Sequence, residues 1–481
     1  MCAAFVAERI RSADGHAEAI SDIARRFAIK GELDLAASLA DTISDPHARD
    51  IALSEIAIIC VDFDDTDYGL QLVEAIEEQG LQQFALSSIA IQRAKRGDVS
   101  GALQTASTVE DAAMIYGSIA VNLSATDELQ AREIAERIEF PIIRTQFFNE
   151  LAAQKIKQNS FAEAQEILTE SLNEADNLEF LEEKTQVLLE IASKLFDAND
   201  ADKAFKILEE VAQIAEKLER RFRDQAFAQI SLLYAQGKDY AKAESILKPI
   251  EDLQQTATAH AAISLEHFTS GETEKAVASL EESYAVLRSQ PERKIIDSQS
   301  RYNLLATIAA RFARFNKPER GLEIALENPV EEARNYALTT IATICAENGN
   351  DTLVRQTINE LGNSAARVFA LIAVSDAERQ KGATEKALQT LNEANALSEE
   401  ISQLPLRSMA LNQIAVRLNE HGEADKTLRA MLENTRVIQT ISDDVELSVA
   451  LANLAETHQK TNIAISESER EILQYIVRRK G

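Results

Sequence analysis

The sequence IAIQRAKRGDVSGA, residues 89–102, contains the pattern that predicts the fold. It combines a large apolar anchor, Ile89, a small residue directly after it, Gly97 eight positions later and Ala102 thirteen positions later. A large apolar anchor followed directly by a small residue occurs in this way at thirteen places, and most of them share the later positions as well, so the chain is predicted to be a tandem repeat. The anchors are Ile23, Ile56, Ile89, Ile119, Leu151, Ile191, Ile230, Ile263, Ile308, Ile341, Ile372, Ile414 and Leu454.

The spacing within each repeat predicts a helical hairpin. The anchor and a large residue three positions before it share one helix face and form an apolar stripe. The small residue after the anchor lets a neighbouring helix approach closely. Gly, Asn or Asp at the eighth position, present in eleven of the thirteen repeats, tolerates the left-handed conformation that ends a helix. In the other two repeats Gly237 and Gly382 lie nearby, and the eleventh repeat fits better when it is counted from Val374.

This spacing is similar to that of the tetratricopeptide repeat, and the similarity extends from about residue 5 to residue 481. The chain differs by having no Trp and by alternating spacings of 30–33 and 39–45 residues, the longer ones predicting longer helices. The resemblance implies an all-α fold, a right-handed α-solenoid of about thirteen antiparallel hairpins. We expect residues 1–18 to form an N-terminal cap or half repeat, residues 19–465 the solenoid, and residues 466–481 a charged capping helix.

The composition limits the partners. The chain has 79 acidic and 50 basic residues, a net charge of −29, which argues against binding nucleic acid or an anionic membrane surface. Residues 1–80 carry 17 acids and 6 bases, so a basic partner is favoured at that end. No apolar run approaches the roughly 18 residues needed to span a bilayer. Three widely spaced cysteines suit reduced thiols, and a cytoplasmic location is expected.

An acidic stretch, VDFDDTDYG at residues 61–69, raises the question of a metal site. It fails as a calcium loop, because Asp67 replaces the glycine and Val73 the final glutamate that such a loop needs. Asp64 instead occupies the turn of the second repeat. We therefore predict an acidic turn whose aspartates cap the second helix, with no bound metal.

Few residues suggest chemistry, and the sequence lacks the common nucleotide-binding, zinc-protease and serine-hydrolase motifs. His260 and His267 share a helix face, which leaves zinc binding as an alternative to a structural pair in the packing stripe. Cys60 and Cys345 fall at an equivalent position and are expected to be small core residues, with redox reactivity as the alternative. We predict no catalytic residue, no metal and no cofactor.

The resemblance implies that the first helices line a concave groove. Its early part is expected to be small and apolar, and carboxamides enter from the fifth repeat onward. Carboxamides donate to and accept from a peptide backbone, so this surface suits a bound segment. The alternative is that they only keep the groove hydrated. The candidate groove residues are Ile58, Ile91, Val121, Gln146, Asn149, Gln186, Gln225, Gln229, Asn303, Asn412, Gln413 and Asn453.

These features favour a non-catalytic scaffold that binds a protein or peptide segment in the groove. Inward basic residues such as Lys95 are too few and too scattered for the clamp that related repeats use on a chaperone's C-terminal carboxylate. One alternative is a regulatory or sensor subunit whose curvature changes when a signalling peptide or small ligand binds. Another is an enzyme built around Cys60 or the two histidines. The sequence does not specify the oligomeric state.

Overall fold

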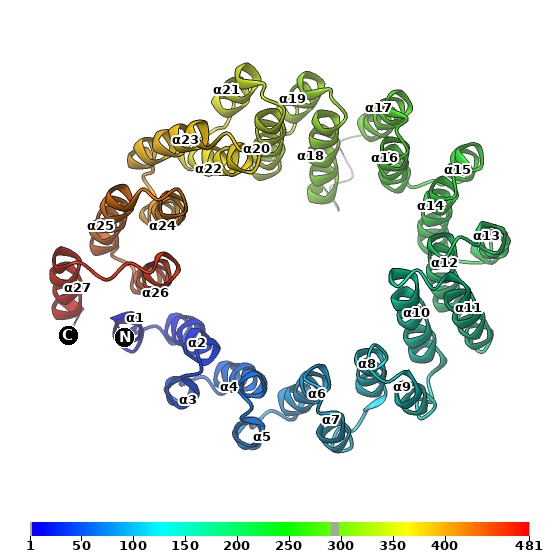
Figure 1. Ribbon diagram of the computed structural model, residues 1–481, viewed down its shortest axis with the longest axis horizontal. Helices are drawn as coiled ribbons and strands as arrows, with labels where there is room; N and C mark the ends of the chain where they lie inside the picture. Colours follow the sequence, from blue (N-terminus) through cyan, green and yellow to red (C-terminus); the bar gives the residue numbers. More distant parts are fainter. Residues whose placement is uncertain (1, 290–297, 481) are drawn as a thin grey trace. The chain divides into compact units, whose positions relative to one another are not determined.

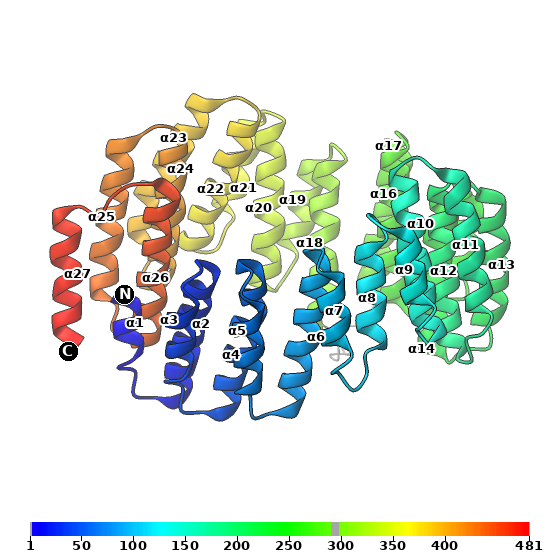
Figure 2. The same ribbon diagram turned by 60° about the horizontal axis from the view of Figure 1, so that its bottom comes forward.

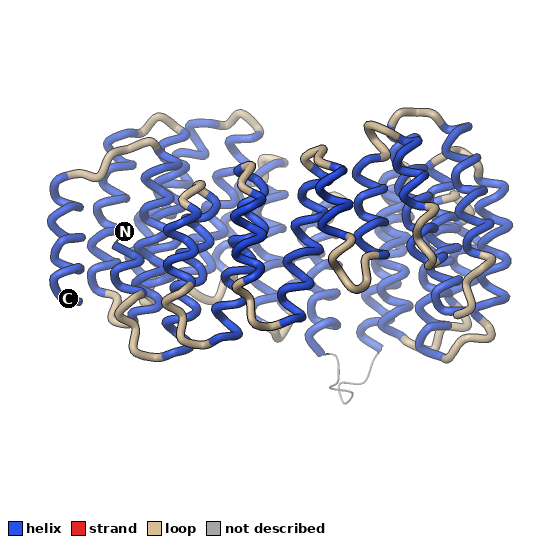
Figure 3. Tube along the Cα trace, turned by 90° about the horizontal axis from the view of Figure 1, so that it is seen from below, coloured by secondary structure: helices blue, strands red, loops and turns tan. Residues whose placement is uncertain are grey.

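The computed structural model describes residues 2–289 and 298–480, and every regular element in them is a helix (Figure 3). The prediction of an all-α repeat fold is confirmed. The first helices of the hairpins are α2 (Ala13–Ile29), α4 (Pro46–Cys60), α6 (Gln79–Lys95), α8 (Ala113–Leu123), α10 (Pro141–Lys157), α12 (Leu181–Asp197), α14 (Arg220–Gln236), α16 (Leu253–Thr269), α18 (Ser298–Arg314), α20 (Glu331–Glu347), α22 (Ser364–Gln380), α24 (Leu404–Glu420) and α26 (Asp444–Thr461).

The second helices differ more in length. Those of the short repeats have 8 or 9 residues, as in α7 and α21, whereas α11 has 15 and α17 has 17. Longer second helices therefore account for the longer spacings, as predicted. The second helices are α3 (Leu33–Ala40), α5 (Thr66–Glu74), α7 (Val99–Ala106), α9 (Glu128–Ala135), α11 (Phe161–Ala175), α13 (Ala201–Ala215), α15 (Tyr240–Leu247), α17 (Thr273–Ser289), α19 (Pro318–Leu326), α21 (Asp351–Asn359), α23 (Thr384–Leu397) and α25 (Ala424–Thr440). The remaining helical elements are α1 (Cys2–Ala7), α27 (Glu467–Lys480) and the 3-10 turns η1 (Val61–Phe63) and η3 (Ser398–Glu400).

The chain divides into two compact units, whose boundaries fall within α6 and α18. Unit 1 comprises residues 1–82 and 305–481, and unit 2 comprises residues 83–304. In unit 2 the helices α8, α10, α12, α14 and α16 form one layer and their second helices form another, with the first helices on the concave side of the unit (Figure 1). We call the surface of this first layer that points away from the second helices the first-helix face of unit 2.

The repeat positions fill the core as the sequence predicts. The anchors Ile89, Ile191 and Ile263 are fully buried, and so are the alanines that follow the first two of them. At Gly69 and Gly321, thirteen positions after their anchors, the second helix meets the first most closely. A Cβ added at Gly321 would lie 2.4 Å from the carbonyl oxygen of Ala309. Small residues at this position therefore let the two helices of a hairpin cross at short range.

The turn after each first helix adopts the left-handed conformation at twelve of the thirteen eighth positions, counting the eleventh repeat from Val374. Asp127 is the exception, because it caps α9 by accepting from the Gln130 backbone N–H. In the seventh repeat Lys238 takes this conformation, with φ 66°, and the neighbouring Gly237 does not. Gly237 serves packing instead, since a Cβ there would lie 2.6 Å from the Phe196 ring.

The acidic stretch of residues 61–69 forms this turn in the second repeat. Asp64 has φ 61° and ends η1, which confirms its predicted place. For Asp65 the predicted capping role is wrong, because this residue stands at the N-cap of α5 and makes no side-chain hydrogen bond to the helix. No group of three or more His, Cys, Asp or Glu side chains in the described residues is arranged to hold a metal ion.

The two ends of the chain pack together within unit 1 (Figures 1 and 2). Helix α1 lies against α26 as a second helix lies against its first helix, and it buries Val6 and Ala7 completely. Helix α2 also contacts α26, where Arg26 Nη1 donates to Glu456 Oε1 at 2.6 Å. Residues 1–18 and 466–481 were each expected to form a cap, and the helices α1 and α27 in these segments contact each other. The first residues of the chain thus complete its last repeat.

Two buried aspartates connect successive repeats in a way that the sequence did not reveal. Asp50 is 1% exposed and accepts from the backbone N–H groups of Glu77 and Glu78, each at 2.9 Å. Asp224 makes the equivalent contacts in unit 2, since it accepts from the backbone N–H groups of the residues 27 and 28 positions later. Both carboxylates therefore hold the chain where it enters the following first helix.

Candidate binding surface

The first-helix face of unit 2 contains a cavity of about 400 Å³. It is lined only by first helices, α6, α8, α10 and α12. Three residues that the sequence assigned to the groove, Ile91, Val121 and Gln146, line it. Its volume lies in the lower part of the range of ligand pockets, ~300–1,000 Å³.

A row of glutamines continues from the cavity along the same face. Gln146, Gln186 and Gln225 each stand five positions before their anchors on the consecutive first helices α10, α12 and α14. All three are exposed, and none makes a hydrogen bond to another residue in the described part of the chain. We call these three residues the carboxamide ladder. Their donors and acceptors are free to bind a partner.

Two of the predicted groove residues do not face the groove. Asn149 is fully buried, and its Oδ1 accepts from Ser171 Oγ of α11 at 2.7 Å. Asn412 is 8% exposed, and its Oδ1 accepts from Asn434 Nδ2 at 2.7 Å and from Thr457 Oγ1 at 2.9 Å. Both stand two positions before their anchors, where the turn of the helix directs the side chain toward the second helix. The prediction for this position was therefore wrong, and the amides link helices instead.

The other predicted residues remain at the surface to different degrees. In unit 2, Gln229 and Asn303 are exposed, and Asn303 Oδ1 accepts from Gln299 Nε2 at 3.2 Å. In unit 1, Ile58, Gln413 and Asn453 are half-buried. These residues bear on binding less directly than the carboxamide ladder, which repeats at one offset on three adjacent helices.

The cavity has charges of opposite sign on its two sides. Lys95 of α6 lines one side, and Glu150 of α10 and Glu190 of α12 line the other. Lys95 and Glu150 form no ion pair within the described residues, while Glu190 lies 3.6 Å from Lys194 Nζ. Both glutamates lie outside the set predicted from the sequence, which contained amides and apolar residues only. Their positions in the repeat could have identified them, since each glutamate stands directly before an anchor, as Gln229 does.

Cys60, Cys345 and His267, three of the residues considered for chemistry, are buried. Burial raises the pKa of the Cys60 thiol to about 12 and that of the Cys345 thiol to about 11, so neither is a thiolate at neutral pH. His267 is 2% exposed, its Nδ1 lies 2.8 Å from Glu272 Oε2, and its ring stacks on Tyr240. These contacts explain why a histidine occupies a core position.

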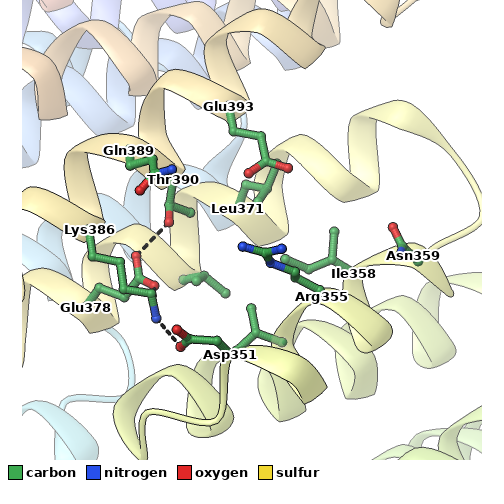
Figure 4. A pocket seen from close by; sticks show the side chains of 12 residues that line it. Asp351, Arg355, Ile358, Asn359, Leu371, Glu378, Lys386, Gln389, Thr390 and Glu393 are labelled. Carbon is green, nitrogen blue, oxygen red and sulfur yellow. Dashed lines mark hydrogen bonds and ion pairs between the residues drawn. The ribbon is translucent and has the colours of Figure 1, made fainter.

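A second cavity, of about 360 Å³, lies in unit 1 among α21, α22 and α23 (Figure 4). Charged groups in its wall pair with one another. Lys386 Nζ lies 2.9 Å from Glu378 Oε1 and also contacts Asp351, and Thr390 Oγ1 donates to Glu378 Oε2 at 2.7 Å. Glu378 is 2% exposed, so these contacts compensate the burial of its charge. We interpret this cluster as part of the packing between repeats.

No protein-family model and no curated protein matches the chain. Solved structures with some likeness include Ton1535 from Thermococcus onnurineus NA1, with 16% identity, coverage of 84% of this chain and 98% of that chain, and a TM-score of 0.25. A circular tandem repeat protein with novel repeat topology has 13% identity, coverage of 97% and 88%, and a TM-score of 0.13. The APC/C hetero-tetramer Cut9-Hcn1 has 10% identity, coverage of 95% and 96%, and a TM-score of 0.21. Likenesses of this size carry no argument about function.

No described helix has the length and apolar character needed to cross a membrane.

Proposed function

We propose that this protein is a non-catalytic scaffold of the tetratricopeptide-like class that binds an extended segment of another protein on the first-helix face of unit 2. The observation that carries the proposal is the carboxamide ladder. Three adjacent first helices present a glutamine at the same offset, exposed and without an internal hydrogen bond in the described residues. If these side chains only kept the groove hydrated, other polar residues would serve equally well, and the same residue type would not be needed at the same position of each repeat.

The dimensions of the ladder suit a peptide backbone. Packed helices lie about 8–10 Å apart, and an extended chain advances roughly 3.3 Å per residue. About every third residue of a segment crossing the helices would therefore meet one glutamine. Each carboxamide can donate to a backbone carbonyl and accept from a backbone N–H, which holds the segment without requiring a particular side chain. We also propose a cytoplasmic location, where free thiols such as Cys60 persist.

The test compares two triple variants in affinity capture from the native lysate. The ladder variant carries Gln146→Ala, Gln186→Ala and Gln225→Ala. The matched control removes three exposed amides from the second helices of the same unit, with Gln104→Ala, Asn173→Ala and Gln213→Ala. The proposal predicts that a protein retained by the native chain and by the control is lost from the ladder variant. Equal retention by both variants would contradict it.

A further inference from the structure

We propose that the cavity on the first-helix face of unit 2 takes a partner segment with three features in a fixed order. These are an acidic side chain toward α6, a bulky apolar side chain in the cavity, and basic side chains toward α12. This inference rests on the proposed function and adds the chemistry and the orientation of the partner. It follows from the floor of the cavity and from the distribution of charge on its walls.

The floor of the cavity is apolar and rigid. Ile143 and Phe147 of α10 are 7% and 0% exposed and are fixed by the core, and Ile91 and Val121 border them. Met114 of α8 is 57% exposed, and its flexible side chain is suited to closing over a guest. A bulky apolar side chain bound here would be removed from water together with the apolar surface that the cavity exposes.

Two small residues of α8 form part of the cavity wall. Gly117 lines the cavity, and a Cβ at this position would lie 2.6 Å from Ile143 Cγ2. Ser118 lines it next to Gly117. The absence of a side chain at Gly117 therefore lets Ile143 of α10 pack close against α8, and this contact forms part of the cavity wall.

The walls give the guest a direction. Lys95 stands on the α6 side, and its ammonium has no carboxylate partner in the described residues. Glu150 and Glu190 stand on the α10 and α12 side, and among the described residues only Glu190 of these two has a nearby cation, Lys194 at 3.6 Å. A segment with the opposite charges in the matching order would pair with both sides, whereas the reversed pattern would place like charges together.

The net charge of the chain favours the basic part of such a segment. With a formal charge of −29, the protein attracts cations over long range and repels strongly acidic segments. A guest with more basic than acidic side chains therefore meets the walls of the cavity and the surrounding field together. The guest is therefore an extended peptide of the pattern acidic, apolar, basic, basic.

The probe is the peptide Asp-Gly-Leu-Gly-Lys-Lys with blocked ends and an uncharged fluorophore, so that only its side chains carry charge. Its binding to the intact protein is followed by fluorescence anisotropy at low salt, where surface charge pairs are least screened. We expect saturable binding that weakens roughly tenfold when Leu is replaced by Ala in the peptide, since one large apolar group is lost.

Charge reversal tests the orientation. The variant Glu150→Lys/Glu190→Lys is expected to weaken binding of the probe about tenfold, and a peptide with Glu-Glu in place of Lys-Lys is expected to recover affinity on this variant. The matched control is Glu133→Lys/Glu210→Lys, which makes the same change in net charge on exposed residues of α9 and α13. The control is expected to stay within about twofold of the native protein.

The outcomes separate this inference from the proposed function. Equal weakening by the two charge-reversal variants, or none by either, overturns the predicted charge order. If the ladder variant still weakens binding in that case, the proposed function stands. If the probe does not bind saturably, the predicted guest is wrong, and the capture experiment with the ladder variant then judges the proposed function by itself.

Discussion

Replacing Val6 by alanine tests the finding that the first residues of the chain complete its last repeat. Val6 is 1% exposed in α1, which packs on α26. The change removes two buried methyl groups, each about 0.8 kcal/mol of transfer free energy. The cavity left behind adds roughly 0.5–1 kcal/mol, so the local stability should fall by about 2–2.5 kcal/mol.

The loss is expected to appear far away in sequence. In a stacked repeat each unit is stabilised by its neighbours, so weakening α1 should let α26 open more often. Since each 1.4 kcal/mol corresponds to a factor of about ten, amide hydrogen exchange in residues 444–461 should accelerate roughly 30- to 70-fold. Val211→Ala is the matched control, because Val211 is equally buried but lies in α13 of unit 2.

Two results would refute this reasoning. One is unchanged exchange in α26 when Val6→Ala measurably destabilises α1. The other is an equal acceleration in α26 for Val211→Ala, which would mean that the effect is global and does not pass through the contact between the chain ends.

Three further outcomes follow from single sites. Lys238→Gly should raise the free energy of unfolding, measured by urea titration, by about 0.5–1 kcal/mol. Lys238 has φ 66°, and the left-handed conformation costs a residue other than glycine ~1–2 kcal/mol, part of which the added freedom of glycine in the unfolded chain offsets. A loss of stability would contradict this. His458 is desolvated, but its pairing with Glu469 at 3.3 Å raises its pKa above 6.5, so the contact between α26 and α27 should be strongest below pH 6.5 and weaken as pH rises through the folded-state pKa. We expect amide hydrogen exchange in α27, corrected for intrinsic rates, to be faster at pH 8.5 than at pH 6. This difference should disappear in His458→Gln, and an equal pH response in that variant would refute the reasoning. Cys60 and Cys345 should resist iodoacetamide at neutral pH until the protein is unfolded, because burial raises the pKa of both thiols, and rapid native-state labelling followed by mass spectrometry would revive a reactive role.

The fold could be predicted well from the sequence because each repeat position is limited to certain residue types by local steric requirements. The left-handed turn needs Gly, Asn or Asp, and close crossing of the helices needs a small residue, so the pattern of Gly97 and Ala102 reports the hairpin directly. Lys238 shows the limit of this logic. The close contact of Gly237 with Phe196 leaves no room for a side chain at that position, and the left-handed turn instead falls on Lys238, a residue type that does not favour this conformation.

The candidate surface was predicted less completely. Residue type alone does not tell which of two neighbouring positions on a helix turns outward, so Asn149 was grouped with Gln146 although it binds Ser171 inside the hairpin. The sequence also predicted a cap or half repeat in residues 1–18, but periodicity cannot show which first helix this segment packs against. That information lies in contacts between segments far apart in the chain, as between Arg26 and Glu456.

The central claim, that a partner segment lies on the first-helix face of unit 2, is tested most directly by site-specific photo-crosslinking. A benzophenone amino acid is placed at Gln186 in one sample and at Gln213 in another, both exposed, on the first helix α12 and the second helix α13 of the same hairpin. Each protein is irradiated in the native lysate. A discrete cross-linked partner is expected from position 186 and none from position 213. Cross-linking from position 213 alone, or equally from both positions, would mean that the partner does not lie on the first-helix face.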